Sequence, residues 1–179
     1  MIVLLSLVGL FFFSHPSFQT KFVNRFTQKI NQNFETDINF KGVEIGFDGS
    51  VNLNSFFIAD HHSDTLFYAK NLKTDLQSFR ELVGGNLFFS ITEFEDVFLK
   101  ITQYEGEKNN SLFQFLQKLL PTPNLNIGLP FYVKIDDLTI TDGRLLMTDK
   151  NNQSEPMEFD NVKLQATDFI VSNDDLEIK

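Results

Sequence analysis

The residues best suited to chemistry lie together in the segment DHHSD, Asp60 to Asp64. Two histidines flanked by two aspartates offer imidazole nitrogens and carboxylate oxygens, which are ligands that zinc accepts. The same residue types also form solvated turns between strands. We interpret the segment as a turn and predict no metal site and no cofactor. A metal-dependent hydrolase built on this segment is the alternative.

The rest of the chain offers no recognisable catalytic arrangement. There is no cysteine, which excludes disulfides and thiolate catalysis. The sequence contains no G-x-S-x-G, P-loop or G-x-G-x-x-G motif. Acid pairs such as Asp136 with Asp137, or Asp174 with Asp175, fall where bends and loops are expected, so solvation explains them. The sequence therefore predicts a protein that is not an enzyme.

The composition indicates apolar partners. Of 179 residues, 22 are Phe, whereas 3 are Tyr and none is Trp. Phe has no polar atom, so a surface rich in Phe suits contact with other apolar matter. The formal net charge is -9, and no cluster of Lys and Arg stands out that could follow a phosphate backbone. Binding of nucleic acid is therefore not expected.

The strand pattern of residues 36–179 contains a recurring irregularity. Apolar residues alternate with polar ones, but at intervals two apolar residues stand three positions apart, as Phe94 and Val97 do. In a regular strand that gap would turn the second residue to the opposite face. A bulge or kink at each gap would restore the face. The hexads are FKGVEI from Phe40, LNSFFI from Leu53, AKNLKT from Ala69, FEDVFL from Phe94, IDDLTI from Ile135 and FDNVKL from Phe159.

Each hexad holds a residue that suits such a kink, because Gly, Asn and Asp tolerate a left-handed backbone. The kink candidates are Gly42, Ser55, Asn71, Asp96, Asp137 and Asn161. Repeated kinks would curl a long antiparallel sheet, and we predict a mainly β fold of that kind. Periodicity alone leaves a β-sandwich open. A curled open sheet would expose an apolar trough, which needs an apolar occupant.

Three further features complete the predicted order of elements. A short helix is expected from Ser111 through Leu120, since Ser111 can cap it. The dipeptide Asp142–Gly143 predicts a hairpin in which residues 143–149 pair back on residues 138–140. The stretch DLEIK at the end resembles a strand that continues, so we expect the native protein to be longer.

The first residues, MIVLLSLVGLFFF, carry no charge. As a helix they would span about 20 Å, against about 30 Å of bilayer hydrocarbon. We predict a signal anchor or partial transmembrane helix over residues 1–17. A cleaved signal peptide fits less well, because basic residues before the apolar run and a small-x-small site after it are both missing. A buried core helix is the third interpretation.

Residues 18–35 predict an amphipathic helix, because apolar residues recur there every four positions. We expect its Phe stripe to cap an exposed end of the sheet. A position on the membrane surface is the alternative. The stripe consists of Phe18, Phe22, Phe26, Ile30 and Phe34.

With these features in view, residues 15–76 resemble the start of the TamB and AsmA-like proteins in the form found in Bacteroidota. The later segments IDDLTITDGRLLM and FDNVKL are similar to the strand pattern of that family, so the resemblance extends over nearly the whole chain. The matching positions are Pro16, Gln19–Thr20, Thr36–Asp37–Ile38, Gly49, Asp60 and Asp64–Thr65–Leu66.

The resemblance implies an inner-membrane anchor and a body in the periplasm. It implies a repeating β-groove, or β-taco, that carries phospholipid acyl chains without catalysis in outer-membrane biogenesis. Some members are instead linked to insertion of outer-membrane β-barrel proteins, so a scaffold for such assembly is the alternative function. An outer-membrane partner would be met through a carboxy-terminal domain that this chain lacks.

Strand phase predicts which residues would line the trough. These residues share one face once each kink is allowed for. Some of them would pack under the helices instead. The predicted lining consists of Val43, Ile45, Phe47, Phe56, Ile58, Leu72, Val97, Leu99, Ile101, Leu138, Ile140, Val162 and Leu164.

Overall fold

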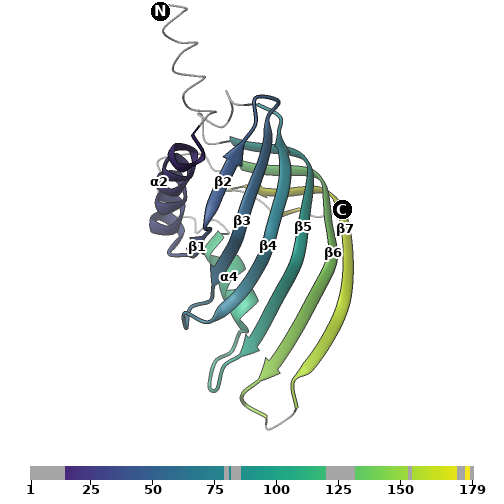
Figure 1. The fold of residues 1–179 in the computed structure, drawn as a ribbon. Helices are drawn as coiled ribbons and strands as arrows, with labels where there is room; N and C mark the ends of the chain where they lie inside the picture. Colours follow the sequence, from purple (N-terminus) through teal and green to yellow (C-terminus); the bar gives the residue numbers. More distant parts are fainter. Residues whose placement is uncertain are drawn as a thin grey trace, which may run out of the picture.

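The computed structural model describes residues 15–78, 81, 86–119, 132–152, 155–172 and 176–177. Most of the predicted anchor, residues 1–14, lies outside this part of the chain. Within the described residues, no helix is both long and apolar enough to cross a membrane. The expectation of a mainly β chain with one curled open sheet is confirmed, and a β-sandwich is not what forms (Figure 1).

Two described helices and eight strands follow one another along the chain. The helix α2 begins two residues before the predicted helix, and α4 begins at Ser111 as predicted. The elements in chain order are α2 (Pro16–Phe34), β1 (Asp37–Asn39), β2 (Gly42–Ile45), β3 (Ser50–Ala59), β4 (Thr65–Leu76), β5 (Asn86–Gln103), α4 (Ser111–Leu119), β6 (Tyr132–Asp149), β7 (Met157–Ser172) and β8 (Leu176–Glu177).

The strands form one sheet in the order β1-β3-β4-β5-β6-β7-β8, and β2 pairs with β3 farther along the same edge as β1. Figure 1 shows the strands bent along their length, with α2 beside β2. The prediction of an antiparallel sheet is wrong at one pair, because β5 and β6 are parallel. The chain passes through α4 between them, and parallel neighbours need such a long connection.

The hairpin predicted at Asp142–Gly143 is also wrong. β6 runs unbroken from Tyr132 to Asp149, and the β6–β7 register shifts on both sides of Gly143. A Cβ atom at Gly143 would stand 3.0 Å from the carbonyl oxygen of Val162. The glycine therefore serves a bulge where two strands approach closely, rather than a turn.

Left-handed residues do occur inside the strands. Ser55 has φ of 52°, Asp96 of 50° and Asn161 of 56°. The other three candidates are corrections, because Gly42, Asn71 and Asp137 are not among the residues of positive φ. A further kink, at Asp168 with φ of 50°, escaped the prediction. Its segment, ATDFIV from Ala166, nevertheless fits the hexad pattern, with Asp168 at the third position and Phe169 at the fourth.

The kinks of β3 and β5 lie opposite the same residue of β4, the strand between them. On β3 and β4, Asn54 pairs with Asn71 and Phe56 with Ala69, so the register continues unbroken past Ser55. The same register on β4 and β5 sets Lys70 opposite Asp96, and the Lys70 Nζ lies 3.1 Å from a carboxylate oxygen of Asp96. A kink therefore bends adjoining strands together without adding a residue to either.

The helix α2 covers the free edge of β1 and β2 through polar side chains. The Gln19 amide donates to the carbonyl oxygen of Ile45 at 3.1 Å and accepts from its N–H at 3.0 Å. Thr20 and Asn31 bond in the same two-way manner to Val43 and Ile38. The unpaired peptide groups of an edge strand require polar partners.

The expectation that the Phe stripe of α2 meets the sheet is therefore wrong at its first residue. Phe18 remains 48% exposed. Gln19 is buried against β2, one residue further along the helix, which rotates the contact face away from Phe18. Phe34, at the other end of the stripe, is buried.

Candidate functional site

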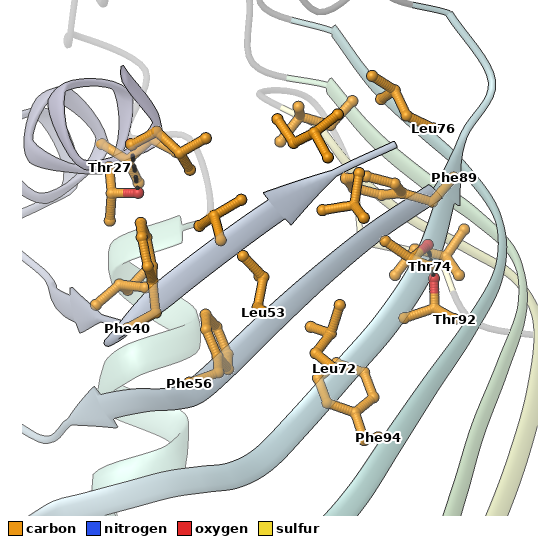
Figure 2. A pocket seen from close by; sticks show the side chains of 18 residues that line it. Thr27, Phe40, Leu53, Phe56, Leu72, Thr74, Leu76, Phe89, Thr92 and Phe94 are labelled. Atoms are coloured by element: carbon orange, nitrogen blue, oxygen red, sulfur yellow. Dashed lines mark hydrogen bonds between the residues drawn. The ribbon is translucent and has the colours of Figure 1, made fainter. Parts of the chain in front are cut away.

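An apolar cavity of about 290 Å³ lies between α2 and the sheet (Figure 2). One wall comes from Val23, Thr27 and Ile30 of α2, and the others come from strands β1 to β6 and from Phe40 between β1 and β2. We call the sheet face that carries Leu53 and Phe56 the inner face. Both residues line the cavity although they stand three positions apart. The Ser55 kink thus has the effect that the hexad predicts.

The cavity wall contains three threonines, yet none leaves its hydroxyl without a partner. Thr27 Oγ1 donates to the carbonyl oxygen of Val23 at 3.1 Å. Thr74 and Thr92 bond to each other, with their hydroxyl oxygens 2.7 Å apart. Because these hydroxyl groups already have hydrogen-bond partners within the protein, a ligand in the cavity would not need to supply polar atoms. The arrangement suits a purely apolar ligand.

Three phenylalanine rings close one end of this region. The ring of Phe56 lies 5.9 Å from that of Phe67 and 6.5 Å from that of Phe94, and Phe67 and Phe94 are 5.6 Å apart. The Phe67–Phe94 pair meets nearly at right angles, at 85°. Edge-to-face rings at such distances attract each other. The three rings therefore form a continuous apolar surface on the inner face across β3, β4 and β5.

The structure places the predicted lining residues in three groups. Val43, Ile45, Phe56 and Leu72 line the cavity. Phe47 lies in the turn between β2 and β3 and is 66% exposed. The remaining residues lie outside the cavity, on the inner face according to the pairing of the strands: Ile58, Val97, Leu99, Ile101, Leu138, Ile140, Val162 and Leu164.

Sequence reasoning missed several cavity residues. Leu53 and Phe94 belong to the hexads and stand in phase with the predicted lining, so the signal was present. Thr92 and Ile135 line the cavity as well. Of the cavity residues from α2, Ile30 belongs to the predicted Phe stripe, whereas Val23 and Thr27 lie outside it and were not predicted.

The inner face continues beyond the cavity to β7. Met157, Phe159 and Leu164 pair with Met147, Leu145 and Ile140 of β6. Their exposed fractions are 56%, 49% and 43%, which are high for large apolar side chains. Large exposed apolar patches are typical of binding surfaces.

The outer face has the opposite character. Lys73 Nζ lies 2.5 Å from a carboxylate oxygen of Glu95, and Lys134 Nζ lies 2.6 Å from one of Asp136. The ion pair with Lys73 lowers the pKa of the Glu95 carboxyl, and the pair with Lys134 lowers that of Asp136. The outer face therefore carries solvated ion pairs, together with aromatic side chains such as Phe98, which lies under the Arg144 guanidinium.

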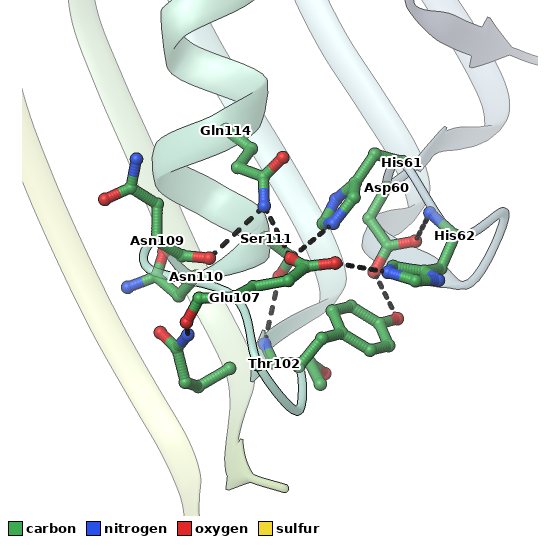
Figure 3. A network of polar contacts seen from close by, with 12 residues as sticks. Asp60, His61, His62, Thr102, Glu107, Asn109, Asn110, Ser111 and Gln114 are labelled. Carbon is green, nitrogen blue, oxygen red and sulfur yellow. Dashed lines mark hydrogen bonds and ion pairs between the residues drawn. The ribbon is translucent and has the colours of Figure 1, made fainter. Parts of the chain in front are cut away.

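The DHHSD segment forms the turn between β3 and β4, and Figure 3 shows Asp60, His61 and His62 in it. The side chains of its two aspartates bond to groups other than the histidine rings. Asp60 accepts hydrogen bonds from the N–H groups of His62 and Asp64 and from the hydroxyl of Tyr104. Asp64 accepts from Lys100 Nζ at 2.6 Å, and this bond lowers the pKa of the Asp64 carboxyl.

The histidines instead meet a carboxylate that the sequence did not single out. Glu107, in the loop after β5, has one oxygen 2.8 Å from His61 Nε2 and the other 2.7 Å from His62 Nε2. These bonds, led by the one with His62, lower the pKa of the Glu107 carboxyl. No local pattern joins Glu107 to the turn, because the sheet alone brings the two segments together.

With this geometry established, comparison with known proteins leaves the assignment open. No protein-family model matches the chain, and no curated protein matches it.

Proposed function

We propose that the chain is the amino-terminal part of a periplasmic bridge protein that carries phospholipid acyl chains on the inner face of its curled sheet. Residues 1–17 would anchor it in the inner membrane, and its role would be lipid supply for outer-membrane biogenesis, without catalysis. The observation that carries the proposal is the run of apolar side chains from the cavity to the exposed residues of β7.

The energetics of an alkyl chain fit this surface. Each buried methylene contributes about 0.8 kcal/mol, and binding of a hydrocarbon chain needs no polar contact. The threonine hydroxyls of the cavity are already paired, so a chain would leave no polar group without a partner. The ion pairs of the outer face would have to lose water to hold the same chain.

The size of the cavity supports a part of a lipid rather than a whole one. A dry cavity of about 150 Å³ is enough for benzene, and this one measures about 290 Å³. The polar head group would therefore stay outside, and the acyl chain would extend along the inner face toward β7.

The alternative, a scaffold for outer-membrane β-barrel proteins, would use free strand edges to pair with a client. Along β1 and β2, α2 already occupies peptide groups of Ile38, Val43 and Ile45. This edge is therefore poorly suited to pairing with a client, which favours the lipid proposal over the scaffold at this end of the sheet.

Photo-crosslinking in cells tests the proposal at two adjacent positions of β6. Ile140 pairs with Phe94 and Leu164 on the inner face, whereas Thr139 pairs with Glu93 and Gln165 on the outer face. Both side chains are half-buried, which makes them a matched pair. A photoreactive Phe analogue at Ile140 should capture phospholipid, and the same analogue at Thr139 should not.

A functional variant separates the two candidates. Ile140→Asp should stop lipid delivery while the protein still accumulates, and Thr139→Asp should be tolerated. Capture of lipid at neither position by a stably folded protein would contradict the proposal. Tolerance of Ile140→Asp, together with sensitivity to proline in an edge strand, would favour the scaffold.

A further inference from the structure

The described part of the chain contains one group of histidine and acidic side chains close enough to share a metal ion, the His–Glu cluster of His61, His62 and Glu107. One ligand atom from each residue lies within 4.8 Å of the others. The histidines come from the β3–β4 turn, and the glutamate comes from the loop between β5 and α4. Two separate segments thus present nitrogen and oxygen donors to one point.

The surroundings hold the three side chains in place. The ring of His62 stacks on Tyr104 with centroids 3.8 Å apart, and the ring of His61 meets Tyr104 edge-on at 5.3 Å. Gln114 of α4 donates to the Glu107 carboxylate at 2.6 Å. Partners that orient a ligating side chain in this way are typical of metal sites.

A second observation is a buried nitrogen without a partner. His61 Nδ1 is buried and has no hydrogen-bond partner in the structure, although the other ring nitrogen faces Glu107. The ring therefore has one nitrogen in contact with the shared carboxylate and one unsatisfied nitrogen, and a buried unpaired nitrogen is costly. An ion bound at Nδ1 would satisfy this nitrogen, whereas an ion bound at Nε2 would replace only the present contact with Glu107.

We propose that the His–Glu cluster binds a divalent transition-metal ion of the zinc class. Two imidazoles and one carboxylate are a donor set that zinc accepts, with water completing the tetrahedron. In a tetrahedral site with bonds of about 2.0–2.2 Å, neighbouring ligand atoms stand farther apart than the present hydrogen bonds, so the carboxylate would withdraw slightly from both rings. Asp60 and Asp64 stay with their present partners.

The bound ion would tie distant parts of the fold together. It would join the β3–β4 turn to the loop that leads into α4, and Lys118 of α4 reaches the carbonyl oxygen of Glu35 at the end of α2. The role of the ion is therefore to fasten the end of the sheet to α4. This inference is independent of lipid binding.

Titration of the tag-free chain with Zn²⁺ by calorimetry tests the proposal, and Co²⁺ supplies a spectroscopic readout. We expect one ion per chain, a Co²⁺ absorption band typical of tetrahedral coordination, and a higher Tm in excess Zn²⁺. His61→Ala, His62→Ala and Glu107→Gln should each weaken binding by about tenfold or more. The third histidine provides the control, and His15→Ala should bind as the parent chain does.

The wild-type measurements keep the test valid even where a variant fails to fold. Absence of saturable Zn²⁺ binding to the folded parent chain, with no Co²⁺ band, would overturn the proposal and leave the cluster as a pair of His–Glu hydrogen bonds. Binding that survives all three substitutions in folded protein would overturn it as well.

Discussion

The contact between Gln19 and Ile45 provides the sharpest test of how α2 closes the sheet. Gln19 is almost fully buried and satisfies both the N–H and the carbonyl oxygen of Ile45. Gln19→Met keeps the length and helix propensity of the side chain but removes both hydrogen-bonding atoms. The substitution therefore isolates the polar contribution of the contact.

The magnitude follows from the two peptide groups that lose their partner. Each buried group left unsatisfied costs about 1–3 kcal/mol, and burial of the methionine side chain offsets about 1–2 kcal/mol. At the middle of these ranges two groups cost about 4 kcal/mol, so after the offset we expect Gln19→Met to lower the free energy of unfolding by about 2–3 kcal/mol. For a domain of this size, that corresponds to a Tm lower by about 4–12 °C.

Urea denaturation, followed by circular dichroism, measures this difference. Gln28→Met is the matched control, because Gln28 lies on the exposed side of the same helix. The control should stay within about 0.5 kcal/mol of the parent chain. The m-value should be similar in all three proteins, since the surface exposed on unfolding is similar.

The reasoning would be refuted if Gln19→Met unfolded within about 0.5 kcal/mol of the parent chain at an unchanged m-value. In that case water would reach Ile45, or α2 would not depend on this contact. A loss equal to that of Gln28→Met would lead to the same conclusion.

Three further predictions concern the strands and the turn. Thr92→Val should destabilise the protein by about 1–3 kcal/mol by leaving the Thr74 hydroxyl alone, and adding Thr74→Val should recover much of the loss in a double-mutant cycle. In chemical denaturation, Asp96→Gly should leave the free energy of unfolding nearly unchanged, whereas Asp96→Val should lower it by about 1–2 kcal/mol, because a β-branched residue resists positive φ. Equal stabilities of the two variants would show that the kink is not needed. Burial, and then the bond to Asp60, raise the pKa of Tyr104. The folded protein therefore keeps the phenol proton where the unfolded chain loses it, so stability should be complete below about pH 10 and fall above it. Tyr104→Phe should flatten that alkaline decline, and an unchanged profile would contradict the assignment.

The pleat of a strand is a local property, and for that reason the face of most residues could be predicted. A gap of three between Leu53 and Phe56 is visible in the sequence, and the residue that resolves it lies inside the gap. The hexads did not reveal which of them carry a left-handed residue at that position, because Gly42, Asn71 and Asp137 are not among the residues of positive φ. Asn71 has no positive φ, since its strand is bent by the kinks in its neighbours.

Features that depend on distant segments could not be predicted. The parallel pairing of β5 and β6 depends on the path of the chain through α4. Glu107 contacts His61 and His62 because the start of β4 and the end of β5 lie side by side in the sheet. The edge contact of α2 was also hidden, because helical periodicity ranks apolar residues first and therefore passed over Gln19 and Asn31.

The alignment of the kinks across the sheet limits which changes of length the protein can tolerate. Ser55 and Asp96 both stand opposite Lys70 of the strand between them. A single residue inserted between a turn and a kink would shift that bend out of line with the bends of the nearby strands. It would also move the side chains beyond the insertion to the opposite face of the sheet. Insertions in the turns would leave the bends aligned. Variation in length should therefore concentrate at strand ends, while the spacing between successive bends stays fixed.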